Sequence, residues 1–284
     1  MKIAREKICL YSSMYPGVSS AEMIIDCAER FEVGGVELMN FCQELSTPDR
    51  AVARALGKRA REKGLALPCF SVGIDAIADP VASLEKLKGY AEICSELEIP
   101  YLHHTIALDY RCGRLPEEEW AKRFNTGTAI ALELAEFCRP LGVRTLIEPQ
   151  GFVFNGIDAV DRLIKMSDEK IGVVADVGNV YFYDTDPVEF ANAMRGRICH
   201  CHLKDYTLTP PPTPTHPYIS KDGVRFYGAD IGAGDIDYDG FFAALKNGGY
   251  NGFYALEFEV LQGDVTVRRA IDFLLERGML WNIT

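Results

Sequence analysis

The sequence predicts a single-domain α/β protein with the (β/α)8 barrel fold, and two observations indicate it. Eight short apolar, β-rich runs recur along the 284-residue chain, and a segment of helical periodicity follows each of them. Strand–helix alternation repeated in this way favours a parallel sheet that closes on itself with helices outside. No glycine-rich GxGxxG follows the first run, so the rival fold, an open sheet that binds dinucleotides, lacks its best support.

The predicted strands are bounded by turn-forming residues and share a high content of valine, isoleucine and aromatic residues. They cover residues 7–13, 34–40, 66–72, 99–105, 143–149, 171–177, 198–204 and 252–258.

The predicted helices begin at recognisable caps. The first opens at a serine, the second at Thr47 with Pro48 in its first turn, and the third repeats that device with Asp79 and Pro80. The fourth is long and ends at Gly142. The helical segments cover residues 19–31, 47–64, 79–97, 116–142, 156–167, 186–196, 237–249 and 266–278.

One connection is longer than the others. Between the seventh and eighth strands, residues 205–235 are too rich in proline and glycine for a helix or a core strand. Long loops in compact domains are commonly functional, and in a barrel this one follows the carboxyl end of a strand, where active sites are built. We therefore expect a long loop that serves as a lid or pocket wall on a single barrel spanning residues 1–284, with a surface insertion as the alternative.

Composition narrows the classes of partner. A net charge of −11 disfavours nucleic acid and anionic membrane surfaces, which call for a basic face. The nine cysteines are odd in number and scattered without a CxxC, as expected of reduced thiols in a cytoplasmic protein. The sequence contains no run of about 18 apolar residues, so it predicts no membrane-spanning helix. The sequence leaves a homo-oligomer open.

Polar residues end four successive predicted strands. Glu148, Asp176, His202 and Glu257 each follow apolar residues close to a strand's carboxyl end. Neighbouring strand ends in a barrel converge on one point, and three carboxylates there repel one another unless a cation neutralises them. Three carboxylates and an imidazole suit a divalent ion such as Mn²⁺, Co²⁺ or Mg²⁺. Taken singly, each residue could equally be a helix cap, a hydrogen-bonded carboxylate or a core histidine.

The stretch "ICHCHLKDY" (198–206) carries two histidines two residues apart. Alternation along a strand puts His200, His202 and Lys204 on one face, with Cys199 and Cys201 on the other. From the segment alone, two metal ligands and a chance pair of buried histidines are both tenable.

These motifs resemble those of the xylose-isomerase-like barrels, a family of sugar-phosphate isomerases and epimerases. The resemblance rests on Glu148, "DVGN" (176–179), "HCHLKD" (200–205), "GAGDID" (232–237) and "EFE" (257–259). It follows the strand order of nearly the whole chain and is densest from Glu148 onward.

The resemblance implies one divalent metal ion, which is Mn, Co, Mg or Zn, held by Glu148, Asp176, His202 and Glu257. It makes His202 the ligand of the histidine pair, with His200 in support. It also implies a metal-dependent isomerase or epimerase, of the kind that uses manganese, acting on a ketose or ketose phosphate. Glu148 and Glu257 would transfer protons to and from the sugar, with a metal-bound enediolate as the intermediate. Such a protein would work in carbohydrate metabolism with a small-molecule sugar as its partner.

Further residues would contact the substrate. They are His103 and His104 at the end of the fourth strand, Asn179, Lys204, and Arg225 in the long loop. Rim charges of this kind are often simply solvated, which is the alternative for each. Which of the two fourth-strand histidines points inward is not fixed by the sequence.

The chain also departs from the family's pattern. Free-sugar 3-epimerases carry a histidine and an arginine where this chain has Asn179 and Leu208, so the substrate shifts away from a plain hexulose. Inosose or dehydroshikimate dehydratases on the same scaffold are the alternative, since they too begin with an enolate. An apurinic-site endonuclease is disfavoured, because the third strand ends without a histidine and residues 205–235 contain no DxH motif.

Overall fold

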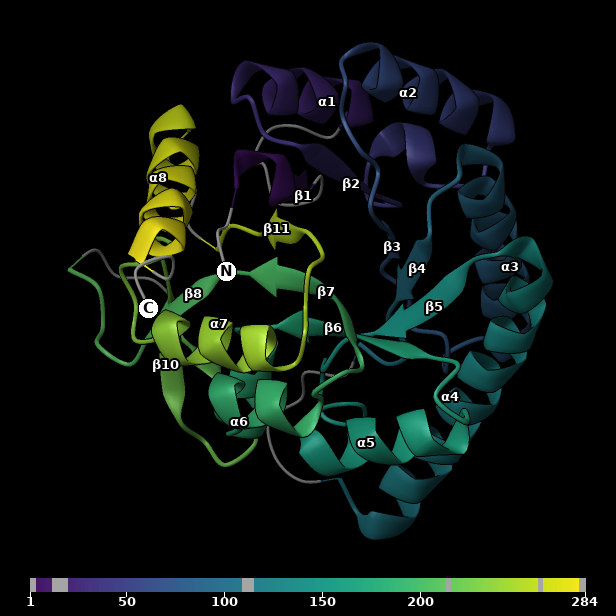
Figure 1. The fold of residues 1–284 in the computed structure, drawn as a ribbon. Helices are drawn as coiled ribbons and strands as arrows, with labels where there is room; N and C mark the ends of the chain where they lie inside the picture. Colours follow the sequence, from purple (N-terminus) through teal and green to yellow (C-terminus); the bar gives the residue numbers. More distant parts are fainter. Residues whose placement is uncertain (1–3, 12–19, 109–114, 213–215, 260–262, 281–284) are drawn as a thin grey trace.

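A closed barrel of eight parallel strands forms the centre of the molecule in a computed structural model, which describes residues 4–11, 20–108, 115–212, 216–259 and 263–280 (Figure 1). The strand order around the barrel is β1-β11-β7-β6-β5-β4-β3-β2. The predicted (β/α)8 fold is therefore confirmed. The barrel strands are β1 (Ile8–Tyr11), β2 (Gly35–Met39), β3 (Phe70–Val72), β4 (Tyr101–His104), β5 (Arg144–Ile147), β6 (Gly172–Asp176), β7 (Ile198–Leu203) and β11 (Tyr254–Leu256).

Eight α-helices of the described residues surround this barrel (Figure 1). They are α1 (Ala21–Arg30), α2 (Arg50–Glu62), α3 (Pro80–Leu97), α4 (Glu117–Cys138), α5 (Ile157–Met166), α6 (Pro187–Ala193), α7 (Tyr238–Asn247) and α8 (Asp264–Leu280). Four short 3-10 helices accompany them: η1 (Arg5–Lys7), η2 (Gln43–Leu45), η3 (Arg139–Leu141) and η4 (Asn179–Tyr183).

The helix caps partly match the expectation. Asp79 caps α3 as predicted and accepts from the backbone N–H of Ala82. Thr47 does not cap α2, because the helix begins after Asp49, whose carboxylate accepts from the N–H groups of two first-turn residues. A carboxylate there satisfies two otherwise unpaired donors.

The serine cap of α1 also works differently from the prediction. Ser20 occupies the cap position, but its hydroxyl donates to Glu44 at 2.5 Å instead of accepting from the helix. Glu44 accepts from the backbone N–H of Ala21 at 3.3 Å and takes the place of the cap.

Alternation along the strands separates an apolar outer face from a polar interior. Outward residues pack against the helices, as in the stacking of Phe70 on Tyr90 with ring centroids 5.2 Å apart. Cys69, Leu146 and Val174 form a small apolar cluster apart from the main core. The carboxyl half of the barrel instead holds buried carboxylates and imidazoles. These are Glu37, His103, Glu148, Asp176, His200 and His202.

Within 205–212 and 216–235, the described residues of the segment predicted as a loop, three strands form a second small sheet. Its antiparallel strands are β8 (Asp205–Thr207), β10 (Arg225–Ala229) and β9 (Tyr218–Ile219), in the order β8-β10-β9. The Asp205 carboxylate accepts from the backbone N–H groups of Gly232 and Gly234, which ties the start of the segment to its end. The described residues of this segment form no helix and add no strand to the barrel, as expected, but they build a regular antiparallel sheet where a loop was predicted.

Within the described residues, no helix combines the length and the apolar character that crossing a membrane requires. The eight cysteines that the structure describes all carry free thiols; Cys112 lies outside the described residues.

Candidate metal centre

Four neighbouring strands deliver the four predicted ligands to one place. Glu148 directly follows β5, Asp176 ends β6, His202 points inward from β7, and Glu257 directly follows β11. All four are buried, with Glu257 the most accessible at 9% exposed. Since β5, β6, β7 and β11 are consecutive around the barrel, these side chains approach a common point from an arc of its wall.

One nitrogen of His202 faces three carboxylates. Its Nδ1 atom lies 3.2 Å from Oε2 of Glu148, 3.5 Å from Oε2 of Glu257 and 3.8 Å from Oδ2 of Asp176. Oδ2 of Asp176 is buried and has no hydrogen-bond partner among the described residues. Three carboxylates buried this close together require compensating positive charge.

The other nitrogen of His202 decides what Nδ1 offers. Nε2 lies 3.0 and 3.2 Å from the two oxygens of Glu37, so it carries the proton and donates it to that carboxylate. In the neutral ring Nδ1 then holds the lone pair, which is the form in which imidazole binds metals. One nitrogen lone pair and three carboxylates fit a divalent ion of the magnesium, manganese or zinc type.

The electrostatics of the cluster favour the uptake of positive charge. Burial opposes the charged form of His202, but Glu37 and Glu148 outweigh it and raise its pKa well above the usual value. Burial, together with Asp176 and Glu148, raises the pKa of Glu257 to about 8 despite the nearby Lys204. Without a metal, the cluster therefore favours protons in its place.

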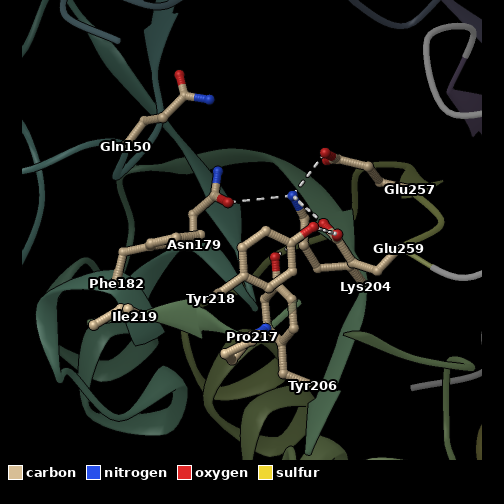
Figure 2. Close-up of a pocket in the computed structure, with 10 residues that line it drawn as sticks. All are labelled: Gln150, Asn179, Phe182, Lys204, Tyr206, Pro217, Tyr218, Ile219, Glu257 and Glu259. Atoms are coloured by element: carbon tan, nitrogen blue, oxygen red, sulfur yellow. Dashed lines mark hydrogen bonds and ion pairs between the residues drawn. The ribbon is translucent and has the colours of Figure 1, made fainter. Parts of the chain in front are cut away.

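Lys204 supplies a second positive charge beside the cluster. Its buried ammonium lies 2.6 Å from Oε1 of Glu257 and 3.2 Å from Oδ2 of Asp176. It also donates to Oδ1 of Asn179 at 3.2 Å and lies 3.8 Å from Glu259 (Figure 2). Gly178 makes room for this lysine, because a Cβ atom there would lie 2.5 Å from Cγ of Lys204.

A cavity of about 450 Å³ opens beside Lys204 and Glu257 (Figure 2). Segment 205–235 builds much of its wall, and the two oxygens of Glu259 accept from the hydroxyls of Tyr206 and Tyr218 at 2.9 and 2.7 Å. This places the small sheet against the end of β11. The lining residues are Gln150, Asn179, Phe182, Lys204, Tyr206, Pro217, Tyr218, Ile219, Glu257 and Glu259.

The structure separates the two fourth-strand histidines. His103 points into the barrel, where its ring meets that of His202 edge-on at 5.2 Å and its Nε2 lies 3.5 Å from Oε1 of Glu148. His104 follows it on the strand and so points to the opposite face, where Nδ1 lies 3.1 Å from the carbonyl of Thr105. His104 does not reach the cavity.

Arg225 is not brought to the site either. It is exposed on β10, and alternation along that strand turns its neighbour Phe226 into the aromatic cluster that contains Tyr206 and Phe182. The expectation that Arg225 contributes to the pocket wall is therefore wrong for this arrangement, and Tyr218 and Ile219 of the same segment line the cavity instead.

Two residues of the polar centre were missed from the sequence. Glu37 is fully buried in β2 and contacts both His200 and His202. Ser71 of β3 donates to Glu37 and lies 2.7 Å from Nδ1 of His103. The one available signal was a carboxylate in the middle of the apolar run "GGVELMN".

The Xylose isomerase-like TIM barrel family model matches residues 25–277. The chain belongs to this family. Among curated relatives, the rhizopine catabolism protein MocC of Rhizobium meliloti is 28% identical over 148 residues, which are 51% of this chain and 45% of that protein. Inosose dehydratase of Lacticaseibacillus casei is 26% identical over 150 residues, covering 50% and 48% of the two chains. This family member therefore spans about half the length of the curated relatives it matches.

Several solved structures share the fold across almost the whole chain. 3-Keto-D-glucoside 4-epimerase of E. coli has a TM-score of 0.71 at 16% identity and covers 97% of this chain and 98% of its own. A xylose isomerase-like barrel of Mycobacterium smegmatis, in complex with magnesium, has a TM-score of 0.74 at 14% identity, with 96% of each chain covered. IolI protein with a bound zinc atom has a TM-score of 0.69 at 16% identity, covering 98% and 96%.

Proposed function

We propose that this protein is a metal-dependent enzyme that moves a proton at the carbon next to a ketone of an uncharged sugar or cyclitol, most simply as an isomerase or epimerase. The observation that carries the proposal is the position of Glu148 and Glu257. Both face Nδ1 of His202, yet they extend from strands separated by β6 and β7. Two carboxylates in that arrangement flank whatever molecule binds between them.

A divalent ion held by Glu148, Asp176, His202 and Glu257 would polarise the ketone and its neighbouring hydroxyl and so acidify the C–H bond between them. The magnesium and zinc in the two metal-containing relatives support this assignment.

The surroundings of the two glutamates divide the work between them. Burial opposes the charge on Glu148, but His103 and His202 outweigh it and hold its pKa well below the usual range, so Glu148 is ionised and free to accept a proton. Burial raises the pKa of Glu257 to about 8 when no metal is bound, so this carboxylate takes up and returns a proton more readily than Glu148 does. Glu148 would take the proton from carbon, the electron pair would move into the ketone to give an enediolate, and Glu257 would return a proton to carbon or oxygen.

The cavity favours a substrate without a phosphate group. Among the described residues that line it, Lys204 is the one cation, and its charge is already balanced by Asp176 and Glu257. Phe182, Tyr206 and Tyr218 offer aromatic surface of the kind that covers the apolar face of a sugar ring. Asn179, Gln150 and Glu259 supply partners for hydroxyl groups.

A dehydratase is the second candidate, because inosose dehydratases are among the curated relatives. The first proton transfer would be the same. The enediolate would then expel a hydroxyl group from the next carbon, and Glu257 or Lys204 would protonate the departing hydroxide to give water. The position of Lys204 against Glu257 is compatible with that role.

Incubation of the Mg²⁺- or Zn²⁺-loaded protein with a panel of ketoses, keto-glucosides and keto-inositols in D₂O tests the proposal. NMR should show deuterium entering at the carbon beside the ketone of at least one compound. A stereoisomer as product would identify an epimerase, and an unsaturated or dehydrated product would identify a dehydratase. Absence of exchange across the whole panel, with metal bound, would contradict the proposal.

A further inference from the structure

The Glu148 carboxylate lies between two histidine nitrogens. Its Oε2 atom is 3.2 Å from Nδ1 of His202, and its Oε1 atom is 3.5 Å from Nε2 of His103. Both histidines are buried, at 0% and 1% exposed respectively. The chemistry of Glu148 therefore depends on which atoms these two rings present to it.

Glu37 sets the orientation of the first ring directly. Nε2 of His202 lies within 3.2 Å of both Glu37 oxygens. A carboxylate only accepts hydrogen bonds, so Nε2 must keep its proton, and the lone pair of Nδ1 is left for a metal ion that Glu148 would also hold.

Glu37 sets the orientation of the second ring through a serine. The hydroxyl of Ser71 donates to Oε1 of Glu37, so its single proton is committed there. The Ser71 oxygen lies 2.7 Å from Nδ1 of His103 and must then accept from it. Nδ1 of His103 keeps its proton, and Nε2 is the nitrogen that faces Glu148. That Nε2 atom is buried and has no other partner among the described residues.

The position of Glu37 suits this orienting role. It is completely buried on β2, contacts His200 Nε2 at 2.6 Å, and is not among the residues that line the cavity. Its strand lies across the barrel from β6, so no local sequence feature connects it with the ligands.

We propose that Glu37 is a positioning residue, which fixes the proton-bearing nitrogen of His202 directly and of His103 through Ser71, and so presents one nitrogen of each ring to the two oxygens of Glu148. The inference rests on the proposed function in taking His202 and Glu148 as metal ligands. It adds a role that the proposed function does not contain, in which the buried carboxylate of Glu37 orients both histidine rings that flank the carboxylate of Glu148.

Calorimetric titration of the metal-free protein with Zn²⁺ alone tests the effect of Glu37 on His202. Glu37→Gln keeps the volume but removes the charge behind Nε2 of His202, so Zn²⁺ affinity should fall by about 10- to 100-fold. Ser71→Ala breaks the link from Glu37 to His103 but leaves the contact of Glu37 with His202, so this variant should bind Zn²⁺ as the wild type does. His104→Asn, which replaces the neighbouring histidine that faces away from the centre, is the matched control and should also bind normally.

Histidine ¹⁵N NMR of the Zn²⁺-loaded protein tests the effect of Glu37 on both His202 and His103, and it needs no substrate. The chain has only five histidines to assign. In the wild type, His202 should carry its proton on Nε2 and His103 should carry one on Nδ1. Ser71→Ala should abolish the Nδ1 preference of His103 and leave His202 unchanged. Glu37→Gln should shift the Nε2 proton signal of His202 upfield, because its acceptor is no longer charged.

The outcomes separate the inference from the proposed function. If the wild type fails to bind Zn²⁺, the metal centre itself is wrong. If the wild type binds but folded Glu37→Gln binds equally well, or if His103 carries no proton on Nδ1, only the role of Glu37 is overturned. Should Glu37→Gln fail to fold, the effect of Ser71→Ala on His103 still decides whether Ser71 orients that ring.

Discussion

The ammonium of Lys204 lies 2.6 Å from Oε1 of Glu257, while Nδ1 of His202 lies 3.5 Å from Oε2 of the same carboxylate. One oxygen of Glu257 thus contacts the buried lysine, and the other faces the proposed metal position. Lys204 also lies 3.2 Å from Asp176, so its charge compensates two of the proposed ligands. The cluster therefore depends on this lysine most strongly when no metal is bound.

Replacement of Lys204 should destabilise the metal-free protein more than the metal-loaded one. Lys204→Met leaves Asp176 and Glu257 buried without their cation, which costs about 3 kcal/mol of unfolding free energy. Urea unfolding with and without Zn²⁺ measures the difference, and bound metal should recover part of the loss. Lys88→Met removes a surface lysine that bridges Glu85 and Glu133, and it should change stability little in either state. Equal losses at both positions would contradict a buried compensating role.

Replacement of the proposed base should separate chemistry from metal binding. Glu148→Gln keeps an oxygen that can contact a metal but cannot take a proton, so turnover should fall by roughly two to four orders of magnitude. Glu148→Ala should lose more metal affinity than Glu148→Gln. Deuterium exchange into a substrate found by the panel, together with Zn²⁺ calorimetry, gives both quantities. Full activity in Glu148→Gln would assign the base elsewhere.

Metal binding should weaken as the pH falls. Glu37 and Glu148 raise the pKa of His202, and burial raises that of Glu257 to about 8, so both groups hold protons in the metal-free protein that a metal must displace. Zn²⁺ affinity should drop by about tenfold per pH unit for each proton released. Calorimetry in buffers of different ionisation enthalpy counts those protons. Glu257→Gln should release one proton fewer, whereas pH-independent affinity would argue against the cluster as the binding site.

His104 should make folding stability depend on pH. Burial lowers the pKa of His104 to about 4, so the folded protein keeps this ring neutral where the unfolded chain protonates it near pH 6.5. Its contribution is fully present above pH 6.5 and is lost as the pH falls towards 4, up to about 3 kcal/mol. His104→Asn can still donate to the Thr105 carbonyl but does not titrate. Its unfolding free energy should therefore fall less between pH 7 and pH 4.5 than that of the wild type.

The hydrogen bonds to Glu259 should hold the cavity wall. Tyr218→Phe removes the hydroxyl that joins β9 to Glu259 and leaves the ring in place, so the wall should loosen without loss of the fold. Proteolysis near residues 216–222 should accelerate, and KM should rise more than kcat falls. Tyr227→Phe, on β10 and outside the cavity lining, serves as the control. If both variants behave alike, the contact to Glu259 does not order the wall.

The sequence alone determined the barrel and the grouping of the four proposed metal ligands at its strand ends. Alternating strand and helix patterns are local, and a parallel sheet places the carboxyl ends of neighbouring strands together, so Glu148, Asp176, His202 and Glu257 could be grouped before any coordinates. His200, His202 and Lys204 share a face for the same local reason.

Only the tertiary structure decided which other residues meet there. Glu37 reaches His200 across 163 residues of chain, a pairing that exists because the barrel closes and that no spacing in the sequence encodes. The choice between His103 and His104 depended on the register of β4 between its neighbours, since a shift by one residue exchanges the two faces. Arg225 was excluded in the same way, by the pairing of β10 with β8 and β9 that turns Phe226 inward. Strand register is fixed by pairing between separate segments of the chain, which no local sequence pattern contains.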